Sequence, residues 1–289
     1  MLESIALAII GGSGLYDLPG LEDMQENHIE TPFGKPSAPI ITGVLEGKRV
    51  AFLARHGQGH QISPSEVNYR ANIFALKLLG VQNIVSISAC GSLREDYAPG
   101  DIVIPDQIFD YTRGRHRTFF GDGIVAHISV ADPFCTRLGN QLLQALNMAD
   151  VHNVHNGGTF ITIEGPRFST KAESSVFRSW GMSIIGMTTS PEAFLAREAE
   201  MCYTVMAHVT DYDVWRTSES PVTVDMVIKV LLENTSLAQK VIHNLASTIN
   251  PNPDCICKSA LESALITQKN YIPNETRKKL DILIGKYLK

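Results

Sequence analysis

The sequence has no run of basic residues and few charged residues of either sign. Charged side chains make up 19% of its 289 residues, and the formal net charge is −5. Without a basic stripe, an electrostatic surface for nucleic acid is not expected. Phosphate recognition must therefore come from local hydrogen-bond donors rather than from a global positive field. The low charge content also gives no sign of a hyperthermophile.

Long apolar runs and targeting signals are missing as well. No apolar stretch approaches the roughly 18 residues of a membrane span, so no membrane partner is expected. The apolar stretch near the N-terminus has no basic region before it and runs into a glycine turn, which favours a first strand over a signal peptide. With 44% hydrophobic residues and a mean hydropathy of +0.01, the chain is expected to be a soluble, cytoplasmic globular protein.

Cysteine is scarce. The five cysteines are Cys90, Cys135, Cys202, Cys255 and Cys257. They are too few and too scattered for a disulfide scaffold. Cys255 and Cys257 are unusually close, but zinc sites normally use a C-x-x-C pair with a second ligand pair, and none follows here. The pair is interpreted as incidental or as a local disulfide or redox element, and no metal site is expected.

Apolar, β-rich runs alternate with helical patterns along most of the chain, without internal repeats. The expected strands are residues 5–10, 39–44, 50–53, 83–88, 101–104, 159–163, 183–187 and 202–209. Several are apolar throughout, as strands buried on both faces should be. This alternation predicts an α/β fold, a single domain with a twisted mixed, mostly parallel central β-sheet flanked by helices.

Helix-start signals mark several of the helices. The expected helices are 63–79, opened by the capping box Ser63-Pro64-Ser65-Glu66, a second after the capping box at Thr170, a third from Ser190 through Ala199, and 224–248 with Thr223 as its cap. Residues 250–254 are typical of a linker. Residues 1–250 are therefore expected to form the α/β domain. Residues 251–289, with helices at 258–269 and 275–288, form a C-terminal extension packed on the core or on a neighbouring subunit.

Small or phosphate-binding residues follow five of the expected strands. They are Gly11-Gly12-Ser13-Gly14, Arg55-His56, Ser88-Ala89-Cys90-Gly91, Met187-Thr188-Thr189 and Thr210-Asp211-Tyr212-Asp213. In open α/β sheets, ligands bind beyond the carboxyl ends of the strands. Hydroxyls, one guanidinium, one imidazole and two carboxylates at that edge suit a phosphate anion beside a base-bearing sugar.

Each of these segments also has a plainer interpretation. The glycine-rich turn fits neither G-x-G-x-x-G nor a Walker loop, so it is either a phosphate loop or a tight turn. Arg55 suits bidentate phosphate recognition and His56 could donate to the same oxyanion, unless both lie in a solvated loop. In an extended chain Asp211 and Asp213 point to the same side, and two close carboxylates raise one pKa, as a general acid requires. A surface turn is the alternative. Phe168 either stacks on a base or packs in the core.

Together these segments closely resemble the trimeric branch of the purine nucleoside phosphorylase family, in particular its 5′-methylthioadenosine phosphorylases, over roughly residues 9–234. The most specific stretches are Thr31-Pro32-Phe33-Gly34-Lys35-Pro36-Ser37, Ala89-Cys90-Gly91-Ser92-Leu93-Arg94-Glu95, Thr162-Ile163-Glu164-Gly165-Pro166-Arg167-Phe168-Ser169, Met187-Thr188-Thr189, Pro191-Glu192 and Thr210-Asp211-Tyr212-Asp213-Val214-Trp215. The resemblance implies a pentosyltransferase that reversibly phosphorolyses 5′-methylthioadenosine to adenine and 5-methylthioribose-1-phosphate, in methionine and purine salvage. It also implies a homotrimer or a dimer of trimers, without metal or organic cofactor.

The resemblance also implies a role for each site residue. The phosphate site would comprise Ser13, Arg55, His56, Ser88, the Ala89 backbone and Thr188. The nucleoside site would comprise Phe168, Ile185 and the backbone of Ala89, Cys90 and Gly91 around adenine, Met187 under the ribose, Val224 and Val227 at the 5′-methylthio group, and His127 from the neighbouring subunit. Asp211 would face purine N7 and Asp213 the 6-amino group, and with His56 they are the expected catalytic residues.

Other interpretations stay open. The animal enzymes carry Asn where this chain has Gly186, and the tail from about residue 251 differs, although Cys255 and Cys257 are similar to features of some archaeal members. A broader purine nucleoside phosphorylase that also uses adenosine, or a phosphorylase of methylthioinosine, is the main alternative. A hydrolytic nucleosidase, a dinucleotide-binding oxidoreductase and a non-catalytic nucleoside-binding protein are the others.

Overall fold

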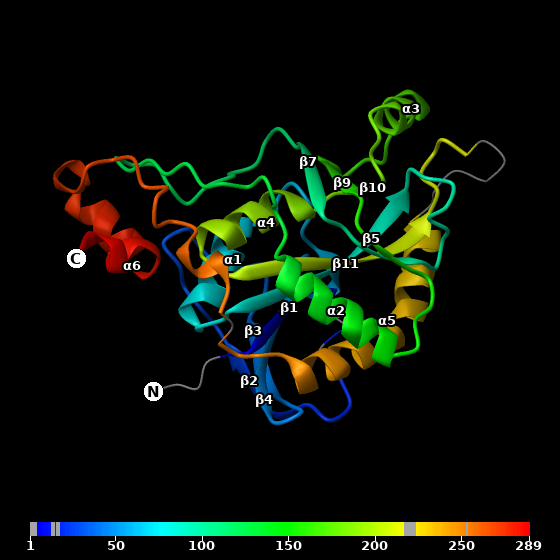
Figure 1. The fold of residues 1–289 in the computed structure, drawn as a ribbon, viewed down its shortest axis with the longest axis horizontal. Helices are drawn as coiled ribbons and strands as arrows, with labels where there is room; N and C mark the ends of the chain where they lie inside the picture. The colour runs from blue at the N-terminus through cyan, green and yellow to red at the C-terminus, as the bar shows by residue number, and fades with distance from the viewer. Residues whose placement is uncertain (1–4, 13–14, 16–17, 217–223, 253) are drawn as a thin grey trace.

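The computed structural model describes residues 5–12, 15, 18–216, 224–252 and 254–289, and for residues 224–234 the backbone alone. Within these residues a central β-sheet carries helices on both faces (Figure 1). The strands are β1 (Leu7–Gly11), β2 (Glu22–Asn27), β3 (Ile40–Leu45), β4 (Lys48–Ala54), β5 (Asn83–Ser92), β6 (Ile102–Ile104), β7 (Gln107–Tyr111), β8 (Val154–Asn156), β9 (Thr159–Ile163), β10 (Ile184–Gly186) and β11 (Cys202–Asp211). The helices are α1 (Tyr69–Leu78), α2 (Thr136–Met148), α3 (Lys171–Ser179), α4 (Thr189–Glu198), α5 (Val224–Thr248) and α6 (Asn274–Leu288).

Strand β5 lies at the centre of the sheet. It pairs in parallel with β1 on one side and β11 on the other, and its last residues pair antiparallel with β10. From β1 the sheet continues through parallel β4 and then antiparallel β3 and β2. From β10 the sheet leads in parallel to β9 and β7, while β11 pairs with β6 and β6 with β8. The expected mixed, mostly parallel sheet is confirmed.

Both faces of the sheet are buried, which explains why its central strands are mostly apolar. In β1, Leu7 and Ile9 belong to an apolar cluster with α2 and α5, whereas Ala8 and Ile10 belong to another with α1 and α4. This follows from the period-two alternation of a strand. Helices α2 and α5 pack on each other, as do α1 and α4, so the fold has a helical layer on each face of the sheet (Figure 1).

All eight strands expected from the sequence are present, with only their ends shifted. The sequence missed β2, β7 and β8. Each of these pairs along one side only, with β3, β9 and β6 respectively. Residues 22–27 are polar and almost wholly exposed, and β8 has three residues. Strands of this kind need no apolar run, so the apolar pattern gives no sign of them.

Four helix predictions are confirmed. The C-terminal helix expected at 275–288 is present as α6, one residue longer. The capping box of α3 is complete, since the Thr170 hydroxyl accepts from the Glu173 N–H and the Glu173 carboxylate accepts from the Thr170 N–H. Helix α4 agrees within one residue, and the bounds of α5 agree fully. The proposed cap of α5, Thr223, lies outside the described residues.

The helix start expected at Ser63 is wrong. The Ser63 hydroxyl does donate to the Glu66 carboxylate at 2.6 Å, but this contact closes an isolated turn. Helix α1 begins six residues later than Ser63, at Tyr69, capped by Asn68, whose side chain accepts from the Ala71 N–H. The helix expected at 258–269 is also wrong, because turns and short 3-10 segments occupy it. Helix α2 was not foreseen.

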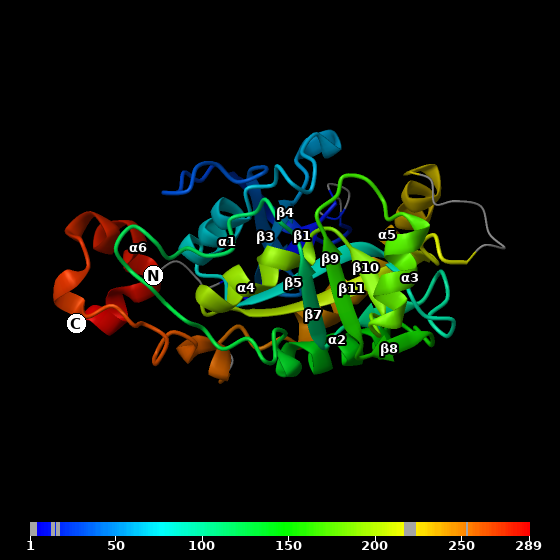
Figure 2. The same ribbon diagram turned by 90° about the horizontal axis from the view of Figure 1, so that it is seen from above.

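The C-terminal segment ends in α6, which lies at one end of the elongated molecule beside the β7–α2 connection (Figure 2). Ala126 of that connection pairs with Leu265, and Lys286 forms an ion pair with buried Glu200 at 2.5 Å. Apolar residues of α6, including Leu283, join the same core cluster as α1 and α4. Among the described residues, no helix is both long enough and apolar enough to cross a membrane.

Candidate active site

The register of the sheet brings the predicted strand ends to one edge. Gly11 lies opposite Ala54, and both Asp211 and Ile185 lie opposite Gly91. Because β1, β4, β5 and β11 run in parallel, their carboxyl ends meet there, which is where ligands of open α/β sheets bind. The sequence-based expectation that these segments converge is met for the residues that the structure describes.

Arg55, at the end of β4, is locked in a buried network. Its Nε and Nη2 donate to the two carboxylate oxygens of Glu192 at 2.8 and 2.9 Å, and Nη2 also donates to Ser86 Oγ at 2.6 Å. Glu192, fully buried in α4, accepts a further hydrogen bond from the Tyr203 hydroxyl. Burial opposes the charge on Arg55, but Glu192 raises its pKa, so the guanidinium stays protonated. The Nε–Nη2 edge of the guanidinium, which would suit bidentate phosphate binding, is therefore already bound to Glu192. Nη1 makes only a long contact of 3.4 Å with the Ile87 carbonyl oxygen.

His56 is neutral and has a defined tautomer. Its Nδ1 lies 2.8 Å from the Ile62 carbonyl oxygen, which can only accept, so Nδ1 carries the proton. Burial and then the charge of Arg55 lower the pKa of His56 to about 4. At neutral pH its Nε2 therefore offers a lone pair. The sequence suggested that His56 donates to an oxyanion, whereas this environment makes Nε2 an acceptor.

Two hydroxyls lie at the same edge. Ser88 is 6% exposed, and its Oγ is 3.3 Å from Ser86 Oγ, which connects it to the Arg55 guanidinium. Thr188 occupies the cap position of α4, but its hydroxyl makes no capping hydrogen bond. Ser88 is therefore linked to the charged network, and Thr188 lies at the start of α4, the helix that carries Glu192.

The two carboxylates lie together, but not for the reason expected. β11 ends at Asp211, and Asp213 has a positive φ of 50°, so the chain does not stay extended. The Asp213 N–H donates to Asp211 Oδ1 at 2.7 Å, and the Thr210 hydroxyl donates to Oδ2 at 2.6 Å. A Cβ built on Gly91 would lie 2.9 Å from Asp211 Oδ1 and 3.4 Å from Asp213 Cβ. The prediction that the chain stays extended through Asp213 is wrong, and a tight turn brings the two carboxylates together.

The carboxyl group of Asp213 is suited to hold a proton. Burial raises its pKa, and the neighbouring Asp211 raises it further. Hydrogen bonds from the Ser174 hydroxyl of α3 and from the Val214 backbone act in the opposite direction and lower it. The carboxylate pair therefore retains a proton to a higher pH than an isolated aspartate does, and loses it as the pH rises.

An apolar slot lies beside the carboxylates. A Cβ on Gly91 would be 3.0 Å from Ile185 Cγ2, so only glycine leaves this space open. Met187 follows β10 and lies close against the 164–170 loop, because a Cβ on Gly165 would be 2.6 Å from its sulfur. Phe168, on that loop, is 38% exposed, so it is not a core residue.

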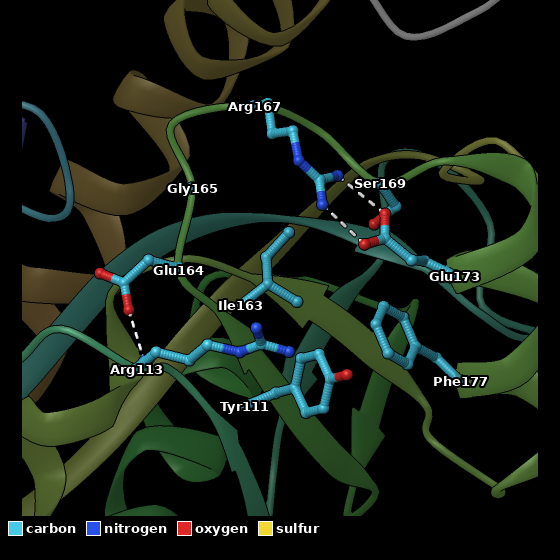
Figure 3. A pocket seen from close by; sticks show the side chains of 9 residues that line it. All are labelled: Tyr111, Arg113, Ile163, Glu164, Gly165, Arg167, Ser169, Glu173 and Phe177. Atoms are coloured by element: carbon cyan, nitrogen blue, oxygen red, sulfur yellow. Dashed lines mark hydrogen bonds and ion pairs between the residues drawn. The ribbon is translucent and has the colours of Figure 1, made fainter.

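A cavity of about 340 Å³ adjoins this slot (Figure 3). It is lined by Tyr111, Arg113, Ile163, Glu164, Gly165, Arg167, Ser169, Glu173 and Phe177. Ile163 and Phe177 belong to the same apolar cluster as Ile185. Across the cavity mouth, Arg167 donates to both carboxylate oxygens of Glu173. None of the expected site residues lines the cavity, so it borders the candidate site without forming it.

Some expected residues are not brought to this edge or cannot be placed. Ser13 and the side chains of Val224 and Val227 lie outside the described residues. His127 is exposed, and its backbone N–H donates to the Ala264 carbonyl in the C-terminal segment.

Four residues of the hydrogen-bond networks around Arg55 and Asp213 were not predicted from the sequence. They are Glu192, Ser86, Tyr203 and Ser174. Glu192 was noted in a helix start and in the Pro191-Glu192 stretch of the resemblance, but the sequence carries no signal that its partner is Arg55. Ser86 was part of an apolar strand, where its alternation with Ser88 was the one available hint.

Comparisons with known proteins agree with this geometry. Residues 6–247 match the model of the phosphorylase superfamily. The chain is 52% identical to S-methyl-5′-thioadenosine phosphorylase of Geobacter sulfurreducens over 283 residues, which cover 98% of this chain and 99% of the relative. It is 55% identical to the enzyme of the same name from Hyperthermus butylicus over 264 residues, covering 90% and 95%.

Solved structures give the same result. A methylthioadenosine phosphorylase from an Antarctic soil metagenomic library is 48% identical and superposes with a TM-score of 0.93, covering 97% of this chain and 99% of that one. The Schistosoma mansoni methylthioadenosine phosphorylase in complex with adenine is 37% identical with a TM-score of 0.84, covering 90% and 98%. The chain therefore belongs to the phosphorylase superfamily and, within it, to the family of S-methyl-5′-thioadenosine phosphorylases.

Proposed function

We propose that this protein catalyses the reversible phosphorolysis of 5′-methylthioadenosine to adenine and 5-methylthioribose-1-phosphate. The observation that carries the proposal is the convergence of Arg55, Ser88 and the Asp211–Asp213 turn at one edge of the sheet, in a chain about half identical to enzymes of that name. The reaction needs a bound phosphate and a proton for the leaving base, and this edge supplies groups for both.

Phosphate binds beyond the ends of β1, β4 and β5. Ser13, Ser88, Thr188 and the Ala89 backbone supply hydrogen bonds, and Arg55 supplies positive charge through Nη1 and through the Ser86–Ser88 chain. Because His56 Nε2 is an acceptor, phosphate binds with one proton attached, and that O–H donates a hydrogen bond to Nε2. Holding both reactants in place contributes about 7 to 11 kcal/mol to lowering the barrier.

The base binds between Phe168, Ile185 and the Ala89–Gly91 backbone, with Met187 under the ribose. Asp211 faces N7 and Asp213 the 6-amino group. Adenine leaves poorly as an anion, so the carboxylate pair delivers its proton to N7 as the glycosidic bond breaks. The oxocarbenium-like sugar is then captured by phosphate. No metal or organic cofactor takes part.

The remaining contacts complete the nucleoside site. Val224 and Val227 form an apolar wall at the 5′-methylthio group. Such a wall rejects an added hydroxyl only about 100-fold, so adenosine is a secondary substrate. His127 is exposed on its own subunit, and we assign it to a neighbouring subunit's site, in a homotrimer or a dimer of trimers.

Phosphate dependence tests the proposal directly. Incubation with 5′-methylthioadenosine should release adenine only when inorganic phosphate is present, with one phosphate esterified for each adenine formed. Adenine measured by chromatography and the sugar phosphate measured by phosphorus NMR give the two amounts. Equal adenine release without phosphate would identify a hydrolytic nucleosidase, and binding without turnover would identify a nucleoside-binding protein.

Base selectivity should depend on Asp213. When the proton shared by the pair lies on Asp211, Asp213 is a carboxylate, which accepts from an exocyclic amine but cannot donate to a 6-oxo group. Asp213→Asn should therefore move the ratio of kcat/KM for methylthioadenosine and methylthioinosine toward the 6-oxopurine by about 10- to 100-fold, the value of one hydrogen bond to a charged group.

Asp211→Asn is the matched control for this shift. N7 is present in both purines, so this variant should lower both kcat/KM values and leave their ratio unchanged. A ratio in Asp213→Asn equal to that of the unmutated enzyme would remove Asp213 from base recognition.

A further inference from the structure

Four of the five cysteines meet at one point. The sulfur atoms of Cys135, Cys202, Cys255 and Cys257 all lie within 4.8 Å of one another. The Cys255 sulfur is 3.6 Å from that of Cys135 and 3.5 Å from that of Cys257. None of them forms a disulfide, and three of the four are buried. We call these four residues the thiol cluster.

The thiol cluster has the dimensions of a tetrahedral zinc site. Zinc binds thiolates at about 2.3 Å in structural sites, so the sulfur atoms of a regular Cys₄ tetrahedron are about 3.8 Å apart. The observed separations bracket that value. A set this compact has room for one metal ion and not for a cluster of several. Four sulfur ligands in tetrahedral geometry select zinc among the common divalent metals.

The ligands come from rigid parts of the fold. Cys135 is the cap residue of α2, Cys202 is the first residue of β11, and the other two lie just before and within a 3-10 turn after α5. The Cys135 N–H donates to the Tyr203 carbonyl at 2.8 Å, which fixes two ligand-bearing segments relative to each other. The sequence gives no sign of a metal site because no second ligand pair lies near Cys257; the other two cysteines are more than 50 residues upstream.

The surroundings favour thiolates. Arg197 Nη1 donates to the Cys257 sulfur at 3.5 Å, and its Nη2 is held by the Asp132 carbonyl. Arg137, two residues after Cys135, places a second guanidinium beside Cys202 and Cys255. The N-terminal end of α2 adds a partial positive charge at Cys135. Together these groups offset the net charge of −2 on a zinc ion with four thiolates.

We propose that Cys135, Cys202, Cys255 and Cys257 bind one structural Zn²⁺ that fastens the C-terminal segment to the α/β core. Binding replaces four S–H bonds with four Zn–S bonds and releases four protons, without oxidation or reduction. A cavity of about 310 Å³ lined in part by Cys135 gives the ion access. Cys202 and Asp211 are at opposite ends of β11, about 30 Å apart for a strand of this length, so the ion has no part in catalysis.

Metal content and spectroscopy test this directly. Protein purified with a thiol reductant and without chelators should contain one zinc ion per chain by elemental mass spectrometry. A mercurial reagent that blocks thiols should release this zinc in proportion to the thiols modified. Replacement by Co²⁺ should give the sulfur-to-metal charge-transfer and ligand-field bands of tetrahedral cobalt thiolate, a signature independent of enzyme activity.

Substitutions sharpen the test. Cys257→Ser should reduce the zinc content to less than a tenth, whereas Cys90→Ser, at a buried cysteine outside the thiol cluster, should retain it. If Cys257→Ser does not fold, the zinc content and the cobalt spectrum of the unmutated protein decide. Any one of three results would overturn the proposal. They are disulfides among the four residues in that reduced preparation, iron in place of zinc, and failure to retain Zn²⁺ and Co²⁺ after gel filtration.

Discussion

Glu192→Gln is expected to lower the free energy of unfolding by about 3 to 5 kcal/mol, the cost of leaving a buried charge without its partner. Glu192 has no exposed surface, and it accepts from Arg55 Nε and Nη2 and from the Tyr203 hydroxyl. The amide can accept only part of these hydrogen bonds and cannot balance the guanidinium. For a chain of this size, thermal denaturation should show a Tm lower by about 10 °C.

Glu173→Gln provides the matched control. Glu173 also forms a two-pronged pair, with Arg167 at 2.6 and 2.7 Å, but 66% of the arginine side chain is exposed. Exposed pairs contribute about 1 kcal/mol or less. Glutamine at this third helical position also preserves the capping box of α3. Equal losses of Tm in the two variants would show that the buried pair has no special importance for stability.

Asp211→Asn is expected to lower kcat/KM for 5′-methylthioadenosine by about 10² to 10⁴, the usual contribution of a general acid. The loss should fall mainly on kcat, because the proton is transferred in the transition state. Steady-state kinetics at saturating phosphate measure it. The same mechanism requires activity to fall as the pH rises and the Asp211–Asp213 pair loses its proton, since burial and mutual repulsion raise the pKa of Asp213.

The fold of this variant should be intact. The asparagine carbonyl can still accept from the Asp213 N–H, and the Thr210 hydroxyl can reverse its hydrogen bond. The Tm and the KM for phosphate are therefore expected to match those of the unmutated enzyme. A kcat/KM within threefold of the original, with these two values unchanged, would contradict the role of Asp211.

The sequence predicts this sheet well where strands are buried on both faces. Strands β5 and β11 are mostly apolar and are buried along nearly all of their length, so both their position and their functional ends are visible in the pattern. Edge strands such as β2 have no such pattern, because one side faces solvent and no apolar run is required. The two capping-box motifs differ in outcome for a similar reason. Ser63 does form a hydrogen bond with Glu66, but only tertiary packing decides whether a helix follows.

Long-range polar partners are the part that the sequence does not reveal. Glu192 meets Arg55 across 137 residues, and both are ordinary charged residues in their local context. The neutral state of His56 likewise depends on burial and on the Ile62 carbonyl, neither of which is a sequence pattern. Such features arise only when the chain has folded.

The space available for a side chain at residue 186 depends on the side chain at residue 160. A Cβ at residue 186 would lie 2.7 and 2.8 Å from two ring carbons of Phe160, which is fully buried in β9. An asparagine at 186 therefore demands a smaller or displaced side chain at 160. A larger side chain at 186 should therefore be tolerated only together with a change at residue 160.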